Sequence, residues 1–359
     1  MFSSENKVAF LYLVRLGLGH YGGNIPEIDD WNAIEKLAAE QGLSAILVDG
    51  IERLPEGQRP PKPVLLQWIG ETLQGYEYRY EQYRKAIAEM AAFYNQHGLK
   101  MMVLKGYAFA LDWSKPEHRP CGDIDIWLFG SYKEADRLLL KEKSIVVDST
   151  HIHHTVFSWG DFMVENHYDI VDTVTSRSNV RIERLFKKLA MDDTHSVEVY
   201  GEKVYIPSPN FHALFLLRHA IMHFTGEGIT IRHALDWGFF VKANGQKIDW
   251  EWLITVLTEY GMDRFFYTLN AICIDYLGFD VDIFPQVRFE PIMKKRVLEE
   301  LLSFTSPLGD EPKGLIKRGI FKYHRRKARE WKHKLCYKEP LWSHLLSSLW
   351  LHITHPGMI

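Results

Sequence analysis

The chain has 359 residues, of which 46% are hydrophobic and 25% are charged, and these fractions are ordinary for a soluble globular protein. The length is sufficient for several packed subdomains, and the net charge of −3 excludes a protein whose whole surface coats nucleic acid. The three cysteines have neither disulfide-framework nor zinc-ligand spacing, so the sequence predicts a reducing compartment.

The first 98 residues carry helical patterns. Apolar residues recur at helical spacing over residues 29–42 and 64–96, and a proline-rich break at 60–63 separates the two segments. The apolar run near the start of the chain is stopped by Arg15, so it is too short to cross a membrane. We therefore predict a helical amino-terminal region, residues 1–98, in a cytoplasmic protein without an integral membrane segment.

Short β-prone runs alternate with helical ones after residue 98. In chain order the expected elements are a strand at Met101–Leu104, a helix at Tyr107–Trp113, an acidic strand ending at Gly130, a helix from Ser131, and strands at Ser144–Asp148, His153–Trp159 and Asp161–Val171. A helix at 180–191 and a β-prone piece at 197–206 follow. This order predicts an α+β fold in which residues 99–206 form a small sheet domain.

A second helical region is expected over residues 207–359. Within it, eleven Lys or Arg stand against one acid, Glu330, between residues 313 and 338. This basic segment has three readings: a solvated helical face, a weak contact with nucleic acid, or a helix on a membrane surface that continues into the aromatic amphipathic stretch Leu341–Ile353.

The acidic strand alternates strictly. Ile124 and Ile126 point to one face, and Asp123 and Asp125 point to the other, which we expect to be open. Two carboxylates held two residues apart are placed to bind a divalent cation through oxygen. Taken alone, the pattern also describes a solvated strand face.

A third carboxylate comes from the second strand of the expected hairpin, where Glu165, His167 and Asp169 share a face. Glu165 would join Asp123 and Asp125 in a cluster whose mutual repulsion requires cations. Two coordinating acids and a third that accepts a proton are the composition needed for two-metal phosphoryl transfer.

Several motifs carry a family resemblance, strongest between residues 104 and 170. They are Leu104-Lys-Gly106, Arg119-Pro-Cys-Gly-Asp-Ile-Asp125, His151-Ile-His-His154, Val164-Glu-Asn-His167, Arg218-His-Ala-Ile-Met-His223 and Arg232-His-Ala-Leu-Asp-Trp237. The chain resembles the uncharacterised bacterial nucleotidyltransferase family of the polymerase-beta-like superfamily. That resemblance implies a polymerase-beta-like palm, with Asp123, Asp125 and Glu165 as catalytic metal ligands for two Mg²⁺ ions, or Mn²⁺ in their place.

The expected nucleotide-binding residues are Lys105, Gly106, Arg119 and Gly122. Lys105-Gly106 stands where the broader superfamily has a Gly-Ser pair that holds the triphosphate. Gly106 would allow close approach of backbone to phosphate, while Lys105 and Arg119 would supply charge. The alternative is that Gly106 only begins a turn and that the two cations only neutralise the acids.

Histidines and one further charged pair form the expected substrate pocket. His167 would orient Glu165 or contact substrate. His219 and His223 lie four apart on a helix, a spacing that binds metal or packs against the sheet domain, and Arg232 and Asp236 have the spacing of an intrahelical ion pair. His151, His153 and His154 are ligand types, but alternation predicts that they are split between faces.

The function predicted is Mg²⁺-dependent transfer of a nucleoside monophosphate from a nucleoside triphosphate to a hydroxyl of an acceptor, which is a small molecule, a saccharide or a peptide. One alternative is a relative that binds nucleotide or another ligand without transfer. A lower-ranked alternative is a metal-dependent phosphohydrolase built on His219, His223 and Asp236.

Overall fold

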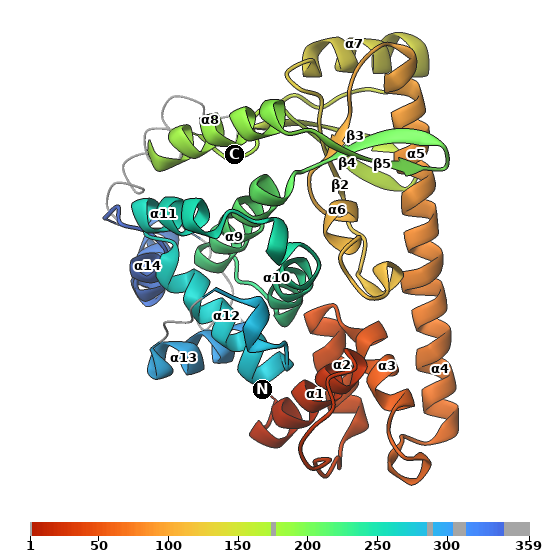
Figure 1. Ribbon diagram of the computed structural model, residues 1–359, viewed down its shortest axis with the longest axis vertical. Helices are drawn as coiled ribbons and strands as arrows, with labels where there is room; N and C mark the ends of the chain where they lie inside the picture. The colour runs from red at the N-terminus through yellow and green to blue at the C-terminus, as the bar shows by residue number, and fades with distance from the viewer. Residues whose placement is uncertain (1, 174–176, 286–289, 304–313, 341–359) are drawn as a thin grey trace. The chain divides into compact units, whose positions relative to one another are not determined.

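Helices and one mixed sheet make up the computed structural model, which describes residues 2–173, 177–285, 290–303 and 314–340 (Figure 1). The chain divides into two units. One takes in Met1–Pro60 and Ala213–Leu341, and the other contains Pro61–His212. The predicted α+β fold class is confirmed. The division into regions 1–98, 99–206 and 207–359 stays a prediction.

One long helix belongs to the second unit, and its last part, α5 (Arg79–Gln96), lies along the sheet (Figure 1). This helix runs through α4 (Lys62–Thr72), a π-helical stretch η2 (Leu73–Tyr78) and α5, as the helical pattern over 64–96 predicts. Buried residues recur along α5 from Tyr83 to Tyr94 at helical spacing and enter the hydrophobic core beneath the sheet. Figure 1 shows α5 beside the strands.

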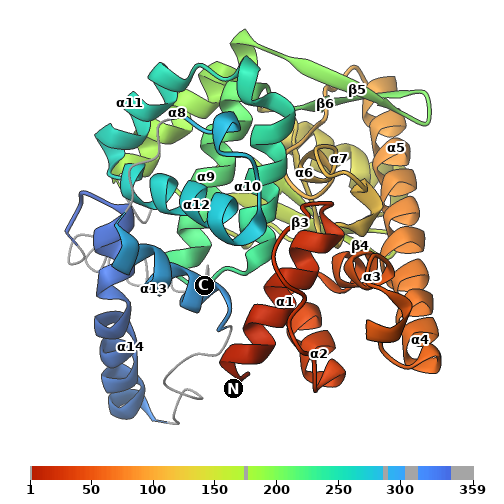
Figure 2. The same ribbon diagram turned by 60° about the horizontal axis from the view of Figure 1, so that its bottom comes forward.

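The sheet has six strands in the order β3-β4-β2-β1-β6-β5. Their bounds are Met102–Val103 (β1), Ile124–Trp127 (β2), His154–Trp159 (β3), Phe162–His167 (β4), His195–Val199 (β5) and Glu202–Ile206 (β6). β2 pairs with β4 and β1 with β6 in parallel, whereas the other pairs are antiparallel. Figure 2 shows the β5–β6 hairpin, which contacts α5.

The β2–β4 register decides which side chains meet. Asp125 is paired with Glu165, and Trp127 with His167. Because paired residues of neighbouring strands project to the same face, one face carries these four side chains. The other face, which includes Ile124, belongs to the core with α5 and residues of α7 (Tyr132–Lys143).

Several expected elements are shorter than their patterns indicate. The first strand is limited to Met102–Val103, and the helix after it, α6, to Tyr107–Ala110. The expected strand at Ser144–Asp148 is wrong, since only Asp148 forms an isolated bridge, to Val156. A segment rich in β-branched residues does not form a strand when only one of its residues pairs with a neighbouring strand.

The remaining elements of this unit connect the strands or follow the last of them. The 3₁₀ turn η3 (Pro116–His118) lies between β1 and β2, α8 (Arg177–Asp192) lies between β4 and β5, and α9 (Pro209–Thr225) begins after β6. Glu183 of α8 accepts hydrogen bonds from the backbone N–H groups of Ile170 and Val171, both at 2.9 Å. The chain that leaves β4 after the site residues is thereby fixed to α8.

The other unit is helical. Its helices are α1 (Ser4–Gly17), α2 (Trp31–Gln41), α3 (Ser44–Glu52), α10 (Ile231–Asn244), α11 (Trp250–Tyr260), α12 (Asp263–Leu277), α13 (Pro291–Leu301) and α14 (Leu315–Cys336), with 3₁₀ turns at Glu56–Gln58, Gly245–Lys247 and Val281–Ile283. The buried Gln41 amide joins three helices, because it donates to Leu301 O at 3.0 Å and accepts from Ile231 N at 2.7 Å.

Most of the basic segment 313–338 is the helix α14. Near its end, Lys332 pairs with Glu300 and the Arg296 guanidinium stacks on Trp331 at 3.9 Å. This end therefore packs within its own unit, whereas Lys327 and Lys334 are exposed. The stretch Leu341–Ile353 lies outside the described residues.

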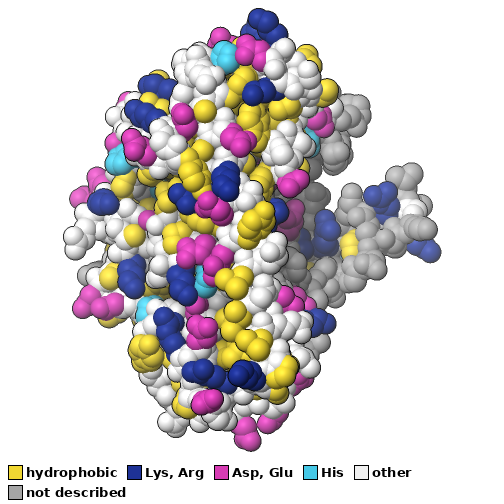
Figure 3. Space-filling model, turned by 90° about the vertical axis from the view of Figure 1, so that its right-hand side faces the viewer, with side chains coloured by type: hydrophobic (Ala, Val, Ile, Leu, Met, Phe, Trp, Pro, Cys, Tyr) yellow, Lys and Arg dark blue, Asp and Glu magenta, His cyan; other side chains and the backbone are white. Residues whose placement is uncertain are grey.

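The described surface is of mixed character. Figure 3 shows positive and negative side chains interspersed with hydrophobic ones on the side of α4 and α5. Among the described helices, none is long and apolar enough to cross a membrane.

Candidate functional site

The middle of the long helix positions the loop that leads into the acidic strand. Three contacts, listed from η2 into α5, fix this loop: Glu77 with His118 at 3.2 Å, Arg79 with the carbonyl of Cys121 at 3.1 Å, and Tyr83 with the carbonyl of Asp123 at 2.7 Å. The π-helical stretch alters the helical phase where the first of these contacts begins.

Asp125 is the most enclosed of the predicted acids. Its carboxylate accepts Lys105 Nζ at 2.6 Å and His167 Nε2 at 2.9 Å, and the residue is 1% exposed. The expectation of two carboxylates on an open face is therefore wrong for Asp125. Burial opposes ionisation, but the Lys105 charge and the hydrogen bond from His167 outweigh it and lower the pKa of Asp125.

Glu165 and His167 complete a compact group with Asp125. His167 Nε2 lies 3.3 Å from Glu165 Oε2, and one ligand atom of each of the three residues lies within 4.8 Å of the others. Burial opposes protonation of His167, but its bonds to Asp125 and Glu165 raise its pKa. Burial also opposes ionisation of Glu165, and the hydrogen bond from His167 is the main influence that lowers its pKa.

Asp123 stands at the edge of this group. It precedes β2, is partly exposed, and is not among the three residues whose ligand atoms are so close. Burial first, and then repulsion from Asp125, raise the pKa of Asp123. The structure thus brings Asp125 and Glu165 together and leaves Asp123 as their neighbour.

The predicted nucleotide-binding residues surround the same end of β1 and β2. Gly106, at φ 57°, is the N-cap of α6. Buried Arg119 donates to the carbonyls of Gly106 and Pro120, both at 3.3 Å. Lys105 is paired with Asp125, and Gly122 is exposed.

Two more histidines reach the site. His154 heads β3 opposite His167, and His153 lies just before the strand, so strand alternation does not separate them. The ring centroids of His153 and His154 are 4.5 Å apart, and His154 Nε2 lies 3.8 Å from Glu165 Oε1. The predicted split of these histidines between faces is wrong.

The other predicted pocket residues belong to the helical unit. The Nε2 atoms of His219 and His223 on α9 lie 3.1 Å apart in a hydrogen bond, and Glu227 lies 3.6 Å from His223. Arg232 and Asp236 lie on α10, with Asp236 buried. Their place in a substrate pocket stays a prediction.

Sequence reasoning missed Asp136, which supports the site from the core face. Its carboxylate Oδ1 accepts Asn166 Nδ2 at 3.0 Å and Thr155 Oγ1 at 3.2 Å. Asn166 stands between Glu165 and His167, and Thr155 follows His154, so this acid fixes the strands that carry the chemistry. The one sequence feature that could have indicated this role is the position of Asp136, an acid on the side of α7 that otherwise faces the core.

Replacing Asp136 with alanine should lower the free energy of unfolding by about 2 kcal/mol, because Asn166 and Thr155 lose their acceptor in a buried place. Urea denaturation measures the change. The control is Asp161→Ala at the exposed β3–β4 turn, which should be nearly neutral. Equal losses in the two variants would contradict the assigned role.

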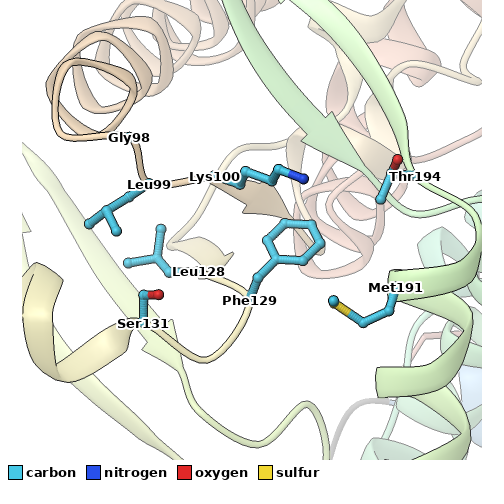
Figure 4. A pocket seen from close by; sticks show the side chains of 8 residues that line it. All are labelled: Gly98, Leu99, Lys100, Leu128, Phe129, Ser131, Met191 and Thr194. Carbon is cyan, nitrogen blue, oxygen red and sulfur yellow. The ribbon is translucent and has the colours of Figure 1, made fainter.

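A cavity of about 280 Å³ lies at the end of β1 and β2 that is opposite to the candidate site. Lys100 precedes β1 and Phe129 follows β2, whereas Lys105 and Asp123 are at the other end. Figure 4 shows Phe129 and Met191 facing this space. None of its lining residues belongs to the predicted site.

Comparisons with known proteins agree with the motifs. A family model described as "Uncharacterised nucleotidyltransferase" matches residues 27–278, and no curated protein matches the chain. The crystal structure of an antigenic nucleotidyltransferase-like protein from Paracoccidioides brasiliensis is 15% identical, covering 55% of this chain and 93% of that chain, with a TM-score of 0.36. The family match spans more than half of this chain, so the chain belongs to this family of uncharacterised nucleotidyltransferases.

Proposed function

We propose that the protein is a Mg²⁺-dependent nucleotidyltransferase that moves a nucleoside monophosphate from a nucleoside triphosphate to an acceptor hydroxyl. The observation that carries the proposal is the convergence of Asp125 and Glu165 from paired parallel strands, in a chain of this family. The acceptor classes are a small molecule, a saccharide and a peptide, and the place of action is the cytoplasm.

The residues present fit a hard divalent cation. Asp125 and Glu165 supply carboxylate oxygens within one group, and Asp123 is adjacent. Burial of negative charge at this point is balanced by Lys105, so a cation is already required there. Asp123, Asp125 and Glu165 would hold Mg²⁺, or Mn²⁺, and the bound ion would offset the charge that develops on the phosphoryl oxygens.

The chain's own residues would position the reactants. Lys105 would exchange its contact with Asp125 for a phosphate oxygen, and Arg119 and the backbone at Gly106 and Gly122 would line the phosphate path. Glu165 would accept the proton of the attacking hydroxyl, with His167 holding the carboxylate in place at 3.3 Å.

The test supplies α-³²P-labelled triphosphates with Mg²⁺ and measures pyrophosphate release and labelling of the protein or of pooled acceptors. Asp125→Asn and Glu165→Gln should each lower the rate by about 100-fold or more, the loss expected when an electrostatic contact to the transition state is removed. Asp161→Asn and Glu198→Gln, which change exposed acids of the same sheet, are the matched controls.

A wild-type protein that binds neither Mg²⁺ nor nucleotide would rule out the proposal. So would label transfer that persists in both Asp125→Asn and Glu165→Gln, because the chemistry would then lie elsewhere. Thermal unfolding of each variant separates lost chemistry from lost structure.

A second candidate is a nucleotide-binding relative that lacks transfer. The observation that favours it is the Lys105 ammonium at 2.6 Å from Asp125, since an internal cation there stands where a metal ion would be needed. Calorimetry that shows nucleotide binding, without pyrophosphate release across many acceptors, would support this candidate. Rapid pyrophosphate release would exclude it.

A further inference from the structure

Three imidazoles gather around Glu165, and one of them, His167, also contacts Asp125. One nitrogen each of His153, His154 and His167 lies within 4.8 Å of the others. His154 and His167 are directly paired across β3 and β4, and their ring centroids are 5.2 Å apart. Strand pairing, together with the support of both strands by Asp136, therefore holds two of the rings in register.

The orientation of His167 is that of a prepared ligand. Its Nδ1 donates to the carbonyl of Asp169 at 3.2 Å, so Nε2 is the nitrogen that faces Glu165 and Asp125, and a bound metal ion would take the place of the Nε2 proton. A backbone carbonyl that fixes one ring nitrogen and presents the other is the usual support of a metal-bound histidine.

His154 is enclosed and incompletely satisfied. The residue is 8% exposed, and its Nδ1 has no hydrogen-bond partner among the described residues. Its Nε2 lies 3.8 Å from Glu165, beyond hydrogen-bonding distance. A buried ring with one orphaned nitrogen and one loosely placed nitrogen indicates a missing partner.

The donor types of the cluster fit a divalent metal ion, because three imidazoles lie beside a carboxylate. Neutral imidazoles offer lone pairs, and Glu165 and Asp125 supply the negative charge that offsets a divalent ion.

We infer that His153, His154 and His167, with Glu165, form a binding site for a divalent transition-metal ion next to the carboxylates proposed to hold Mg²⁺. Imidazole ligands suit zinc, cobalt and similar ions, whereas Mg²⁺ prefers carboxylates and water. Two imidazole nitrogens on one zinc ion lie about 3.3 Å apart, so small side-chain movements within the 4.8 Å group bring the ligands to that spacing. The site shares Glu165 with the proposed Mg²⁺ centre, but metal binding there does not require the transfer reaction.

The test uses full-length protein without a histidine tag, stripped with chelator and kept free of nucleotide. Addition of Co²⁺ should give d–d absorption bands that saturate at one equivalent and disappear on addition of Zn²⁺. His153→Gln and His154→Gln should each weaken Co²⁺ binding by about 100-fold. Removal of residues that only support a metal ligand already lowers metal affinity by about 10- to 100-fold, and the loss of a ligand should cost at least as much.

Two variants serve as controls. His195→Gln changes an exposed histidine of β5, and Asp123→Asn changes only the proposed Mg²⁺ centre; both should retain the Co²⁺ bands. Unchanged bands in His153→Gln and His154→Gln, or absent bands in the wild type, would overturn the inference. If thermal unfolding shows that buried His154→Gln is not folded, the partly exposed His153→Gln decides. Since no nucleotide is present, failure of transfer leaves this result unaffected.

Discussion

Replacing Lys105 with methionine is expected to lower the free energy of unfolding by about 3 kcal/mol, the low end of the cost of breaking a buried ion pair from one side. The ammonium contacts Asp125 at 2.6 Å, with 18% of the Lys105 side chain and 2% of the Asp125 side chain exposed. Methionine keeps the apolar stem but removes the charge. Asp125 and Glu165 then share His167 as the nearest cation among the described contacts.

A divalent cation should restore much of this loss. At about 100 times its dissociation constant, a bound ion adds about 2.7 kcal/mol to the stability of the folded state. The gain with Mn²⁺ should be larger in Lys105→Met than in the wild type, because in the wild type the ammonium must first leave Asp125. Urea denaturation with and without Mn²⁺ measures both gains.

Lys85→Met, at an exposed position on α5, is the matched control and should have little effect on stability or on the Mn²⁺ response. An equal Mn²⁺ gain in wild type and Lys105→Met would show that Lys105 and the cation do not share Asp125.

The stability difference should also shrink at acid pH. Lys105 and His167 hold the pKa of Asp125 below its usual range, so the contribution of the pair is present above the pKa of an unfolded Asp, about 3.9. It is lost as the pH falls through the folded value, where Asp125 becomes protonated. The stability difference between wild type and Lys105→Met should therefore begin to shrink as the pH falls below about 4, and it should vanish only well below that pH.

Gly106→Ala is expected to cost about 3 kcal/mol or more, from backbone strain and a lost buried hydrogen bond. Gly106 has φ 57° and ψ −93°, a conformation that disfavours any side chain. An added Cβ would stand 2.2 Å from the hydroxyl of fully buried Tyr83. Tyr83 would have to move, and its bond to the Asp123 carbonyl would break.

A double-mutant cycle separates the two causes. Tyr83→Phe removes the clashing oxygen, so the loss in Gly106→Ala/Tyr83→Phe should be smaller than the sum of the single losses by about 1 kcal/mol or more. Gly160→Ala, at φ 56° with open space around the added Cβ, reports strain alone. Additive losses would show that Tyr83 does not limit Gly106.

The sequence by itself determined the order of most elements and predicted the acids of the candidate site. Strict alternation around Asp125 and Glu165 identified two strands, and helical spacing identified α5 and the carboxy-terminal helices, because both patterns are local. The motif between residues 104 and 170 identified the family, which the comparison confirms.

Only the tertiary structure decided how these residues meet. The parallel pairing of β2 with β4 brought Asp125 beside Glu165, and the antiparallel pairing of β3 brought His154 beside His167, neither of which a single strand specifies. Burial of Asp125 under Lys105 replaced the expected open face. Such contacts join residues that are far apart in the chain, so local sequence patterns do not predict them.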